Sequence, residues 1–496
     1  MFKKVLKIIA VICTLFASAI ILLPYINKSN VNTQIKGSNE MQVNYTAAVT
    51  NTWNISANAD ESVIATLDEN GLLTISGEGS MKDWEFNSTS EWHSIKTQIK
   101  QLKIEEGVTN IGNHAFFGCT QLSEIEIPNS ITNIGESAFE DCRSLTEIVI
   151  PGGVATIERE AFCGCNNITS ITIEDGVTTI GNAVFAQNHF ITEVIIPESV
   201  TSMESSVFNG CDKLTNIKVN TNNANYCDIN GVLYTIDKTV IIKYPEGKTE
   251  ESYTICSEVT SIDGWAFFEC KYLQEIIIPD GVIDIGELTF YNCTKLTQIN
   301  IPSKVTSIGE WSFRGCNGLT RIIVPKSLVN IGKSAFFDCK NLTILCYEGS
   351  TIHNYAQENE IPYEIIYLTS DEQTIDQETL IIRGIEPKTT VQEIKTCIQS
   401  NVPYEIINKS GEVLEDTEII GTGYTLKMCT GETYKIIVWG DLNGDGEIKI
   451  SELARASRIG ISEEQISETE MLVMDVSMDG NIKINDLAAI SRLARK

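Results

Sequence analysis

Between residues 108 and 345, apolar and polar positions follow one pattern that recurs every 23 residues. The stretches VTNIGNHAFFGCTQLSEIEIPNS (108–130), ITNIGESAFEDCRSLTEIVIPGG (131–153) and VTSIGEWSFRGCNGLTRIIVPKS (305–327) share the template [VI]xxIxxxAFxxCxxLxxIxIPxx. Eight copies begin at Val108, Ile131, Val154, Val177, Val200, Val259, Val282 and Val305. A ninth begins at Leu328 and departs from the template after Leu345. Self-similarity at a fixed period of this size predicts a solenoid of stacked units.

Each repeat is predicted to contain one short strand and one apolar wall. In LxxIxI the apolar side chains alternate, so one side of the strand faces a core. The proline that follows, as at Pro128 and Pro302, has no N–H for a sheet and ends the strand. One unit is too small to bury its own apolar side. Stacking therefore predicts a parallel sheet and a continuous column of phenylalanines.

The register is interrupted once. Val200 and Val259 are 59 residues apart, which is 23 plus 36. The extra residues include NGVLYTIDKTVIIKYPEGK, a sequence typical of a β-hairpin. We therefore expect a hairpin insertion at 220–257 that remains inside the solenoid.

The repeat resembles the leucine-rich repeats of the BspA-like surface-protein family, over roughly residues 53–367. LLTISGEGSMKDWEF and SEWHSIKTQIKQLKIEEGVTNIG resemble the capping unit of that family, with the strand column continuing through Leu102 and Ile104. GSTIHNYAQENEIPYEIIY resembles the closing cap. The resemblance implies an α/β leucine-rich repeat solenoid with an N-terminal cap at 53–107 and repeats at 108–367.

Charge and the N-terminus restrict the class of protein. With 37 basic and 66 acidic residues the formal net charge is −29, which argues against nucleic-acid binding because phosphates need a basic face. Within the first 29 residues, MFKKVLK supplies three lysines and is followed by 18 uncharged residues, IIAVICTLFASAIILLPY. This predicts an export signal, and the length of the apolar run leaves an uncleaved membrane anchor open. A linker is expected at 30–52, and the protein is expected to be secreted or held at a bacterial cell surface.

Most of the 15 cysteines occupy one column of the repeat. The column contains Cys119, Cys142, Cys165, Cys211, Cys270, Cys293, Cys316 and Cys339, with Asn188 in one place. Parallel side chains stacked in register do not suit disulfide geometry. We expect buried free thiols that act as small hydrophobic groups.

A binding face is predicted on the outward side of the LxxIxI strands. Two outward columns include Glu124, Glu147, Glu193 and Glu275, and Val149, Ile195, Ile277 and Ile323. Solvated glutamates are the simple interpretation in an acidic protein, and an interface for a basic or amphipathic protein is the alternative. A third column of serine and threonine is interpreted as a structural hydrogen-bonding ladder. The four histidines fall in different registers and no catalytic set is visible, so no enzyme activity is predicted.

The chain after the solenoid divides into two further parts. Residues 368–379 are polar and acidic and are expected to form a linker. Residues 380–439 predict a small β-rich spacer module, with strands around Ile381, Tyr404, Leu426 and Ile436 and a short helix at VQEIKTCI.

Residues 441–452 (DLNGDGEIKISE) and 475–486 (DVSMDGNIKIND) have the spacing of 12-residue calcium loops. The predicted side-chain ligands are Asp441, Asn443, Asp445 and Glu452 in the first loop and Asp475, Ser477, Asp479 and Asp486 in the second. Glu447 and Asn481 would each offer a backbone carbonyl. Lys449 and Lys483 at loop position 9 cannot ligate, so water is expected there. Two Ca²⁺ ions are predicted, the second more weakly bound because serine replaces asparagine.

A strand precedes the first loop, and one exiting helix follows each loop. Loop plus helix, given twice, resembles the type I dockerin family over 440–496, which implies an all-α calcium-binding domain that docks on a cohesin domain of a scaffold or cell-surface protein. The cohesin-binding residues implied are Ile450, Ser451, Ser457, Arg458, Ile484, Asn485, Ser491 and Arg492. The first two positions of each set often carry Ser or Thr in that family, so the class of cohesin is open.

These features predict a non-catalytic extracellular binding or adhesion protein. Its solenoid would bind a protein or cell-surface ligand, and its tail would dock on a scaffold, in one setting within a polysaccharide-degrading complex. The alternative is an enzyme component of such a complex, a glycoside hydrolase, which would need two carboxylates flanking a sugar cleft. A third interpretation is that the calcium sites only stiffen the C-terminus.

Overall fold

The computed structural model describes residues 31–33, 43–45, 48–58, 62–86, 90–459, 466–478 and 482–495. The predicted export segment, 1–29, lies outside these residues. Within them, no helix has both the length and the apolar character needed to span a membrane. The chain forms two compact units. The first comprises Met1–Ile236 with Tyr244–Lys248, and the second comprises Asp237–Lys243 with Thr249–Lys496.

The N-terminal part of the first unit is a cap whose sheet leads directly into the repeats. β1 (Val31–Thr33) and β2 (Val43–Tyr45) form a separate antiparallel pair. The elements of the cap are β3 (Val49–Asn54), β4 (Val63–Asp68), β5 (Leu72–Gly77), β6 (Gly79–Ser80), the 3-10 helix η1 (His93–Gln98) and β7 (Gln101–Ile104). β3, β4 and β5 are antiparallel, and β7 then pairs with β5 in parallel. Leu102 faces Ile125 of the first repeat strand, so the predicted continuation of the strand column into the cap is confirmed.

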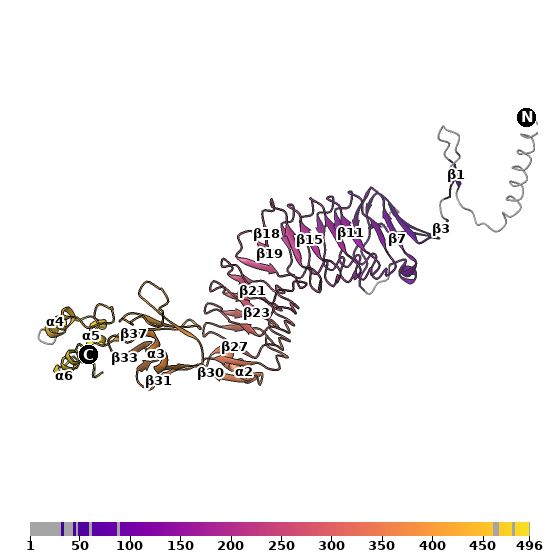
Figure 1. Cartoon of the computed structure of the whole chain (residues 1–496). Coiled ribbons are helices and arrows are strands. Elements are labelled where there is room, and N and C mark those ends of the chain that lie inside the picture. The colour runs from indigo at the N-terminus through magenta and orange to yellow at the C-terminus, as the bar shows by residue number, and fades with distance from the viewer. Residues whose placement is uncertain are drawn as a thin grey trace, which may run out of the picture. The chain divides into compact units, whose positions relative to one another are not determined.

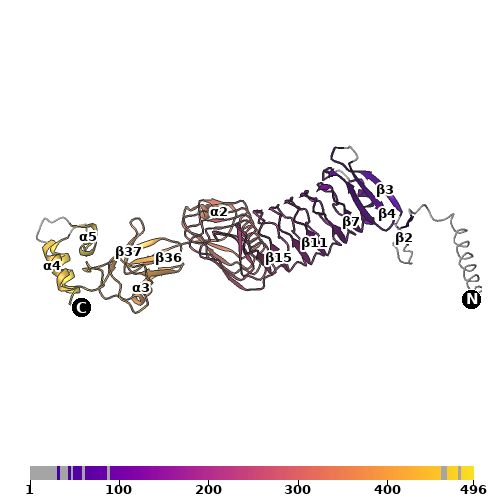
Figure 2. The ribbon, with the colours of Figure 1, turned by 90° about the horizontal axis from the view of Figure 1, so that it is seen from above.

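The repeats of the first unit build two rows of parallel strands. The LxxIxI segments form β9 (Glu124–Glu126), β11 (Glu147–Ile150), β13 (Ser170–Ile173), β15 (Glu193–Ile196) and β17 (Asn216–Val219). The start of each repeat forms β8 (Val108–Ile111), β10 (Asn133–Ile134), β12 (Thr156–Ile157), β14 (Thr179–Ile180) and β16 (Ser202–Met203). Within these two rows, paired residues are 23 positions apart, such as Ile134 with Ile157. Figures 1 and 2 show these strands following one another from β7 through β11 to β15.

A hairpin follows the last of these strands, as the sequence predicts. β18 (Tyr226–Ile229) and β19 (Val232–Thr235) are antiparallel. The two residues between them, Asn230 and Gly231, have φ angles of 53° and 77°. Asn-Gly with both φ angles positive is the turn that matches the twist of a two-stranded hairpin.

The second unit continues the repeat with its own two sets of parallel strands. One set is β20 (Val240–Lys243), β22 (Ser261–Ile262), β24 (Asp284–Ile285), β26 (Ser307–Ile308) and β28 (Asn330–Ile331). The other is β21 (Ser252–Thr254), β23 (Glu275–Ile277), β25 (Gln298–Ile299), β27 (Arg321–Ile323), β29 (Thr343–Cys346) and β30 (Tyr363–Ile365). Helix α2 (Thr351–Glu358) closes the repeats by burying Ile352, Tyr355 and Ala356.

Phenylalanine rings stack through the core of each unit. In the first unit Phe139 and Phe162 are parallel at 5.0 Å between ring centroids, and in the second Phe313 and Phe336 are also 5.0 Å apart. Trp92 ends the first stack against Phe116 at 5.6 Å. The predicted aromatic column is therefore confirmed within both units. Removing such a buried ring typically destabilises a protein by about 3–5 kcal/mol.

The cysteine column forms a hydrogen-bonding ladder. All described cysteines are free, as predicted. The Cys142 thiol donates to the Phe116 carbonyl at 3.3 Å, and Cys316 donates to Phe290 at 3.1 Å. At the one exception, Asn188 Nδ2 donates to the equivalent Phe162 carbonyl at 3.0 Å. The column thus selects a small donor that satisfies a carbonyl of the preceding repeat.

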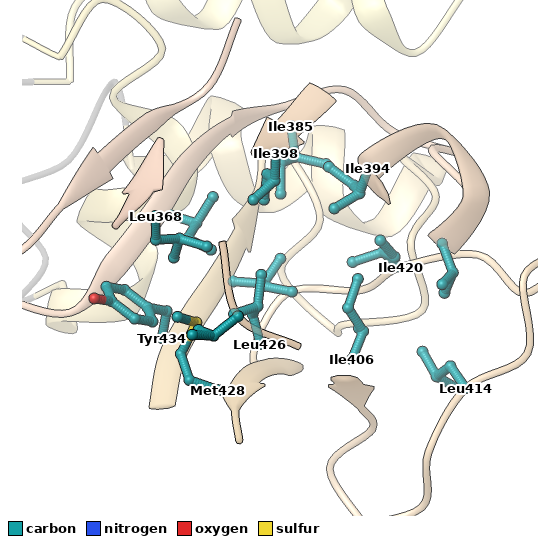
Figure 3. Close-up of a cluster of buried hydrophobic side chains, with 14 of the residues drawn as sticks. Leu368, Ile385, Ile394, Ile398, Ile406, Leu414, Ile420, Leu426, Met428 and Tyr434 are labelled. Carbon is teal, nitrogen blue, oxygen red and sulfur yellow. The ribbon is translucent and has the colours of Figure 1, made fainter. Parts of the chain in front are cut away.

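The β-rich module packs onto the end of the repeats in the second unit. Its elements are β31 (Leu368–Ser370), β32 (Thr374–Asp376), β33 (Ile381–Ile385), α3 (Val391–Cys397), β34 (Ile398–Ser400), β35 (Tyr404–Ile407), β36 (Thr425–Met428) and β37 (Thr433–Val438). The predicted strands and helix are all present. Figure 3 shows its core, in which Ile394 of α3 and Ile406 and Leu426 of the sheet point toward one another. Leu345 of the last repeat belongs to the same buried cluster.

The linker expected at 368–379 is wrong. β31 pairs with β34 and β32 pairs with β33, so these residues are the first strands of the module. Leu368 is buried and Ile375 packs against the core cluster. The polar residues between them face outward on short strands, which explains why the segment has no clear apolar period.

Where it is described, the C-terminal region has three helices, and two were predicted. They are α4 (Ile450–Ile459), α5 (Glu468–Met474) and α6 (Ile484–Leu493). The additional helix, α5, precedes the second loop and starts with a capping box between Ser467 and Glu470. A small core joins α4 and α6 through Ala456, Ile459 and Ile490.

Candidate functional site

The predicted ligand face lies on the outward side of the strands. Val149 and Ile195 in the first unit are 52% and 55% exposed, and Ile277 in the second unit is 51% exposed. The glutamates at the preceding outward positions are exposed at Glu124, Glu147 and Glu275 and half-buried at Glu193. Ile323 is the exception, because it packs against the module core. The predicted orientation is confirmed for the others, while ligand binding by them stays a prediction.

Two of these glutamates have polar partners within the face. Glu193 forms an ion pair with Lys218 at 2.9 Å, and Glu124 accepts a hydrogen bond from Gln101 at 2.8 Å. Exposed pairs of this kind contribute at most about 1 kcal/mol. Among the described residues, neither Glu147 nor Glu275 forms an ion pair. The acidic column is therefore only partly neutralised by the protein.

The hydroxyl column beside them is structural. Thr169 Oγ1 donates to the Thr146 carbonyl at 3.2 Å, and Thr297 Oγ1 donates to Gln274 at 3.1 Å. Thr215 Oγ1 makes the equivalent bond to the Thr192 carbonyl of the preceding repeat at 3.2 Å. The predicted ladder is confirmed, and these hydroxyls are not available as a separate site.

A groove of about 710 Å³ lies in the second unit between the repeat strands and the module. Its solenoid wall contains Glu275 and Ile277 of β23, Gln298 of β25 and Asn300. Its other wall comes from Tyr404 and Glu405 of β35 and from Lys427, Met428 and Cys429. Sequence analysis found Glu275, Ile277 and Ile323, which the structure brings together here. It gave no signal for the module wall, which lies about a hundred residues away along the chain.

Direct contacts fix the module at this groove. Arg321 donates to the Asn401 carbonyl at 3.0 Å and pairs with Glu364 at 3.3 Å. Gly431 lies so close to Ser303 that a Cβ there would collide with it. The Tyr347 hydroxyl, whose pKa is raised by burial and by Glu432, donates to the Glu432 carboxylate at 2.6 Å. The module is therefore a wall of the groove rather than a spacer.

In the first predicted calcium loop, buried carboxylates organise the backbone. Asp441 is fully buried, and its Oδ1 accepts the amides of Gly444 and Asp445 at 2.7 and 3.1 Å. Glu452 is 4% exposed and accepts the amides of Asn443 and Lys449 at 3.1 and 2.8 Å. Among the described residues, no cationic side chain forms an ion pair with Asp441 or Glu452. A buried carboxylate without a counter-charge is unfavourable.

The second loop repeats this arrangement where it is described. Asp475 and Asp486 are 3% and 1% exposed. Asp486 accepts the amides of Ser477 and Lys483, both at 2.8 Å. These are loop positions 3 and 9, the same two whose amides Glu452 holds in the first loop. Asp479 and Asn481, two further predicted ligands, lie outside the described residues.

The oxygen ligands available in the first loop are of the chemical type that a hard divalent cation binds. Carboxylates, the Asn443 amide oxygen and the Glu447 carbonyl are the oxygen ligands that Ca²⁺ prefers. Within the described part of the chain, no three His, Cys, Asp or Glu side chains are gathered tightly enough to hold a metal ion. In this loop the Lys449 ammonium contacts Asp445 and lies 3.7 Å from Glu447. Calcium binding would require this lysine to move away.

The residues implied for cohesin binding are displayed by the two loop ends and helices. Ile450 and Ile484 are 85% and 82% exposed, the most exposed large apolar side chains described. Arg458 Nε donates to the Ala454 carbonyl at 3.3 Å, and Arg492 Nε makes the equivalent bond at 3.2 Å. Ser451, Ser457 and Asn485 are exposed and Ser491 is half-buried. The duplication in sequence is thus also a duplication in local geometry.

Comparisons with known proteins bear on the repeats. A family model described as "BspA type Leucine rich repeat region" matches residues 92–215 and 246–377 in six copies. A leucine-rich repeat protein from Eubacterium ventriosum ATCC 27560 is 27% identical with a TM-score of 0.49, covering 60% of this chain and 78% of that chain. A leucine rich cell surface protein from Faecalibacterium prausnitzii A2-165 is 24% identical with a TM-score of 0.44, covering 64% of this chain and 98% of that one. The pneumococcal vaccine antigen PcpA is 20% identical with a TM-score of 0.45, covering 60% and 81%. No curated protein matches.

Proposed function

Because the chain belongs to the family of BspA-type leucine-rich repeat regions, we propose that it is a non-catalytic extracellular binding or adhesion protein. Its solenoid holds a protein or cell-surface ligand on the outward side of its strands, and its C-terminal region docks on a cohesin-bearing scaffold. The matching family consists of leucine-rich repeats and is not a catalytic family. Glu275 and Glu405 line a groove from its two walls, but the matching family model describes leucine-rich repeats, so the glycoside hydrolase remains the alternative.

The exposure of Val149, Ile195 and Ile277 carries the proposal for the solenoid. Each is more than half exposed at an equivalent strand position. Covering apolar surface contributes roughly 25 cal/mol for each Å² removed from water. The neighbouring carboxylates Glu147 and Glu275 favour a partner with basic residues. This combination supports a protein interface more than a simply solvated face.

The buried carboxylates carry the proposal for the tail. Two Ca²⁺ ions would be held by Asp441, Asn443, Asp445, Glu447 and Glu452 in the first loop and by Asp475, Ser477, Asp479, Asn481 and Asp486 in the second. Bound calcium would supply the positive charge that Asp441 and Glu452 lack. The loops would then hold α4 and α6 in place, so that Ile450 and Ile484 present apolar anchors to a cohesin.

The solenoid proposal is tested with a triple variant, Glu147→Lys, Glu193→Lys and Glu275→Lys. Adhesion of the labelled full-length protein is measured on immobilised extracellular-matrix and cell-wall proteins. Binding should fall at least about tenfold, which corresponds to 1.4 kcal/mol. The matched control is Glu204→Lys, Glu287→Lys and Glu310→Lys, three exposed glutamates outside the strand face with the same charge change. Equal binding by both triple variants would contradict the proposal.

The docking proposal is tested on a panel of recombinant cohesins, with calcium and with excess EDTA. The full-length protein should bind at least one cohesin in calcium only. Ile450→Asp with Ile484→Asp should abolish this binding while leaving the calcium affinity unchanged. The control Val413→Asp alters another large exposed apolar residue, in the module. Cohesin binding that persists in EDTA would exclude a calcium-dependent dock.

A further inference from the structure

We propose that the groove between the repeat strands and the module is where the solenoid takes its partner, and that its occupant is an extended peptide segment with a basic residue beside an apolar one. This inference rests on the proposed binding function. It adds the place on the solenoid and the chemical class of the ligand.

The dimensions of the groove fit a chain segment rather than a folded domain. Its volume of about 710 Å³ lies in the range of ligand pockets, roughly 300–1,000 Å³. It crosses β23, β25 and β27, three neighbouring rungs that lie about 4.8 Å apart. Two such intervals, about 10 Å, correspond to roughly three residues of extended chain. A short extended segment therefore spans the groove, and its flanking residues reach out over the rims.

The charges of the lining favour a basic occupant. Glu275, Asp280 and Glu405 line the groove, and none of them forms an ion pair among the described residues. Arg321, one of two cations in the lining, is already engaged by Glu364 and by the Asn401 carbonyl. Lys427 remains, opposite Glu405 in the strand register. The three carboxylates thus outnumber the one cation that lacks a partner.

Apolar and amide side chains complete the lining. Ile277 is 51% exposed, and Tyr404 is half-buried at the facing wall. The side-chain amides of Gln298 and Asn300 form no hydrogen bond within the described protein. Each amide has both a donor and an acceptor, the pair that a peptide backbone requires. An alternating basic and apolar peptide can therefore meet carboxylates, isoleucine and amides at once.

The groove is formed before a ligand arrives. The contacts of Arg321 with Asn401, of Gly431 with Ser303 and of Tyr347 with Glu432 join the two walls. The shared core through Leu345 adds to them. A preformed site loses less conformational entropy on binding, which favours affinity for a short segment.

The first test measures fluorescence anisotropy of labelled peptides with the full-length protein. One peptide of about six residues, long enough to cross the groove, carries lysine, leucine and serine. Its counterpart carries glutamate in place of lysine. We expect the basic peptide to bind at least about tenfold more tightly. Equal affinity for the two peptides would overturn the charge argument.

Variants then locate the binding. Glu275→Gln with Glu405→Gln removes two carboxylates of the groove without changing side-chain size, and affinity for the basic peptide should fall at least about fivefold. Glu287→Gln with Glu310→Gln is the matched control, because both are exposed glutamates that lie outside the strand face and outside the groove lining. If Glu287→Gln with Glu310→Gln weakens binding as much, the groove is not the site, although binding to a generally acidic surface would still satisfy the proposed function. If neither variant matters, the groove proposal fails while the adhesion test above stands by itself.

Cys429 offers a second, independent reporter. It is an exposed free thiol in the groove lining, whereas Cys256 is a free thiol outside it. The basic peptide should slow alkylation of Cys429 by iodoacetamide at least about threefold and leave Cys256 unchanged, as expected for direct occlusion. Mass spectrometry of the digested protein reads both sites in one sample. Protection at neither site, or equal slowing at both, would contradict occupation of the groove.

Discussion

The solenoid and the C-terminal loops satisfy their buried polar groups in opposite ways. In the solenoid, a donor in one repeat bonds to an acceptor in the preceding repeat, as the Cys142 thiol donates to the Phe116 carbonyl. In the loops, the buried Asp441 and Glu452 carboxylates meet only amides, mostly of their own loop. The solenoid is complete with its own residues, because each interface is supplied by a neighbour. The loops carry negative charge that the protein does not balance.

Removal of calcium by a chelator should give the largest difference in stability between the two regions. If calcium supplies the missing charge, excess EDTA removes the tail fold, because metal binding and folding are one equilibrium. Hydrogen exchange should then show loss of protection in α4 and α6 and no change in β11 or β13. A calcium concentration about 1,000 times the Kd would contribute roughly 4 kcal/mol. Unchanged protection of α4 in EDTA would show that the loops do not depend on a metal.

Alkaline pH should have the opposite effect: it should destabilise the solenoid and leave the C-terminal loops unchanged. Burial raises the pKa of the Cys119 thiol from 9.0 to about 12, and burial also raises the pKa of Cys142 and Cys316. Above pH 9 the unfolded chain loses these protons while the folded chain keeps them. The stability from burying neutral thiols is present below that pH and is lost as pH rises toward the folded pKa values, by about 1.4 kcal/mol per pH unit for each thiol.

Denaturant unfolding of the solenoid, followed by circular dichroism from about pH 8 to about pH 10.5, measures this loss. The calcium loops at 441–452 and 475–486 contain no cysteine, so their metal affinity should not share this loss. A solenoid midpoint that stays constant across the range would contradict buried, neutral thiols.

A pair of adjacent phenylalanines tests the core stack. Phe336 is 2% exposed and stacks on Phe313, while Phe337 is 58% exposed beside Arg314. Phe336→Ala should lower the free energy of unfolding of the second unit by about 3–5 kcal/mol. Phe337→Ala should lower it by at most about 1 kcal/mol, the value of an exposed cation–π contact. Similar losses in denaturant unfolding would mean that the stack does not dominate the core.

Sequence analysis predicted the repeated parts of the fold well, because a buried residue that recurs every 23 positions must stack on its copies. The strand column, the Phe stack and the outward direction of Val149 follow from that period. The S-x-x-E spacing of Ser467 and Glu470 was also a readable helix start, although α5 was not predicted from it.

The remaining features depend on contacts that have no period. β31 and β32 are short strands with polar outward residues, so their sequence resembles a linker. The groove joins Glu275 to Glu405, which are remote in sequence and unrelated in pattern. Trp265 and Trp311 adopt φ angles of 64° and 54°, a left-handed conformation that bulky residues rarely adopt. There the repeat backbone overrides the local preference of the residue.

Asn188 gives the smallest and sharpest comparison, because it places a buried polar atom without a hydrogen-bond partner in the cysteine column. Its Nδ2 donates to the Phe162 carbonyl as a cysteine thiol would, but its buried Oδ1 accepts no hydrogen bond. An unsatisfied buried acceptor typically costs about 1–3 kcal/mol. Asn188→Cys restores the donor of the column and removes that acceptor, so it should match or exceed the wild type in the free energy of unfolding by up to about 1 kcal/mol. Asn188→Ala removes the donor as well and should fall below Asn188→Cys by about 1 kcal/mol. Denaturant unfolding of the three proteins decides the point: if Asn188→Cys is no more stable than Asn188→Ala, the thiol contributes no stabilising hydrogen bond, and the interpretation of the cysteine column as a hydrogen-bonding ladder fails.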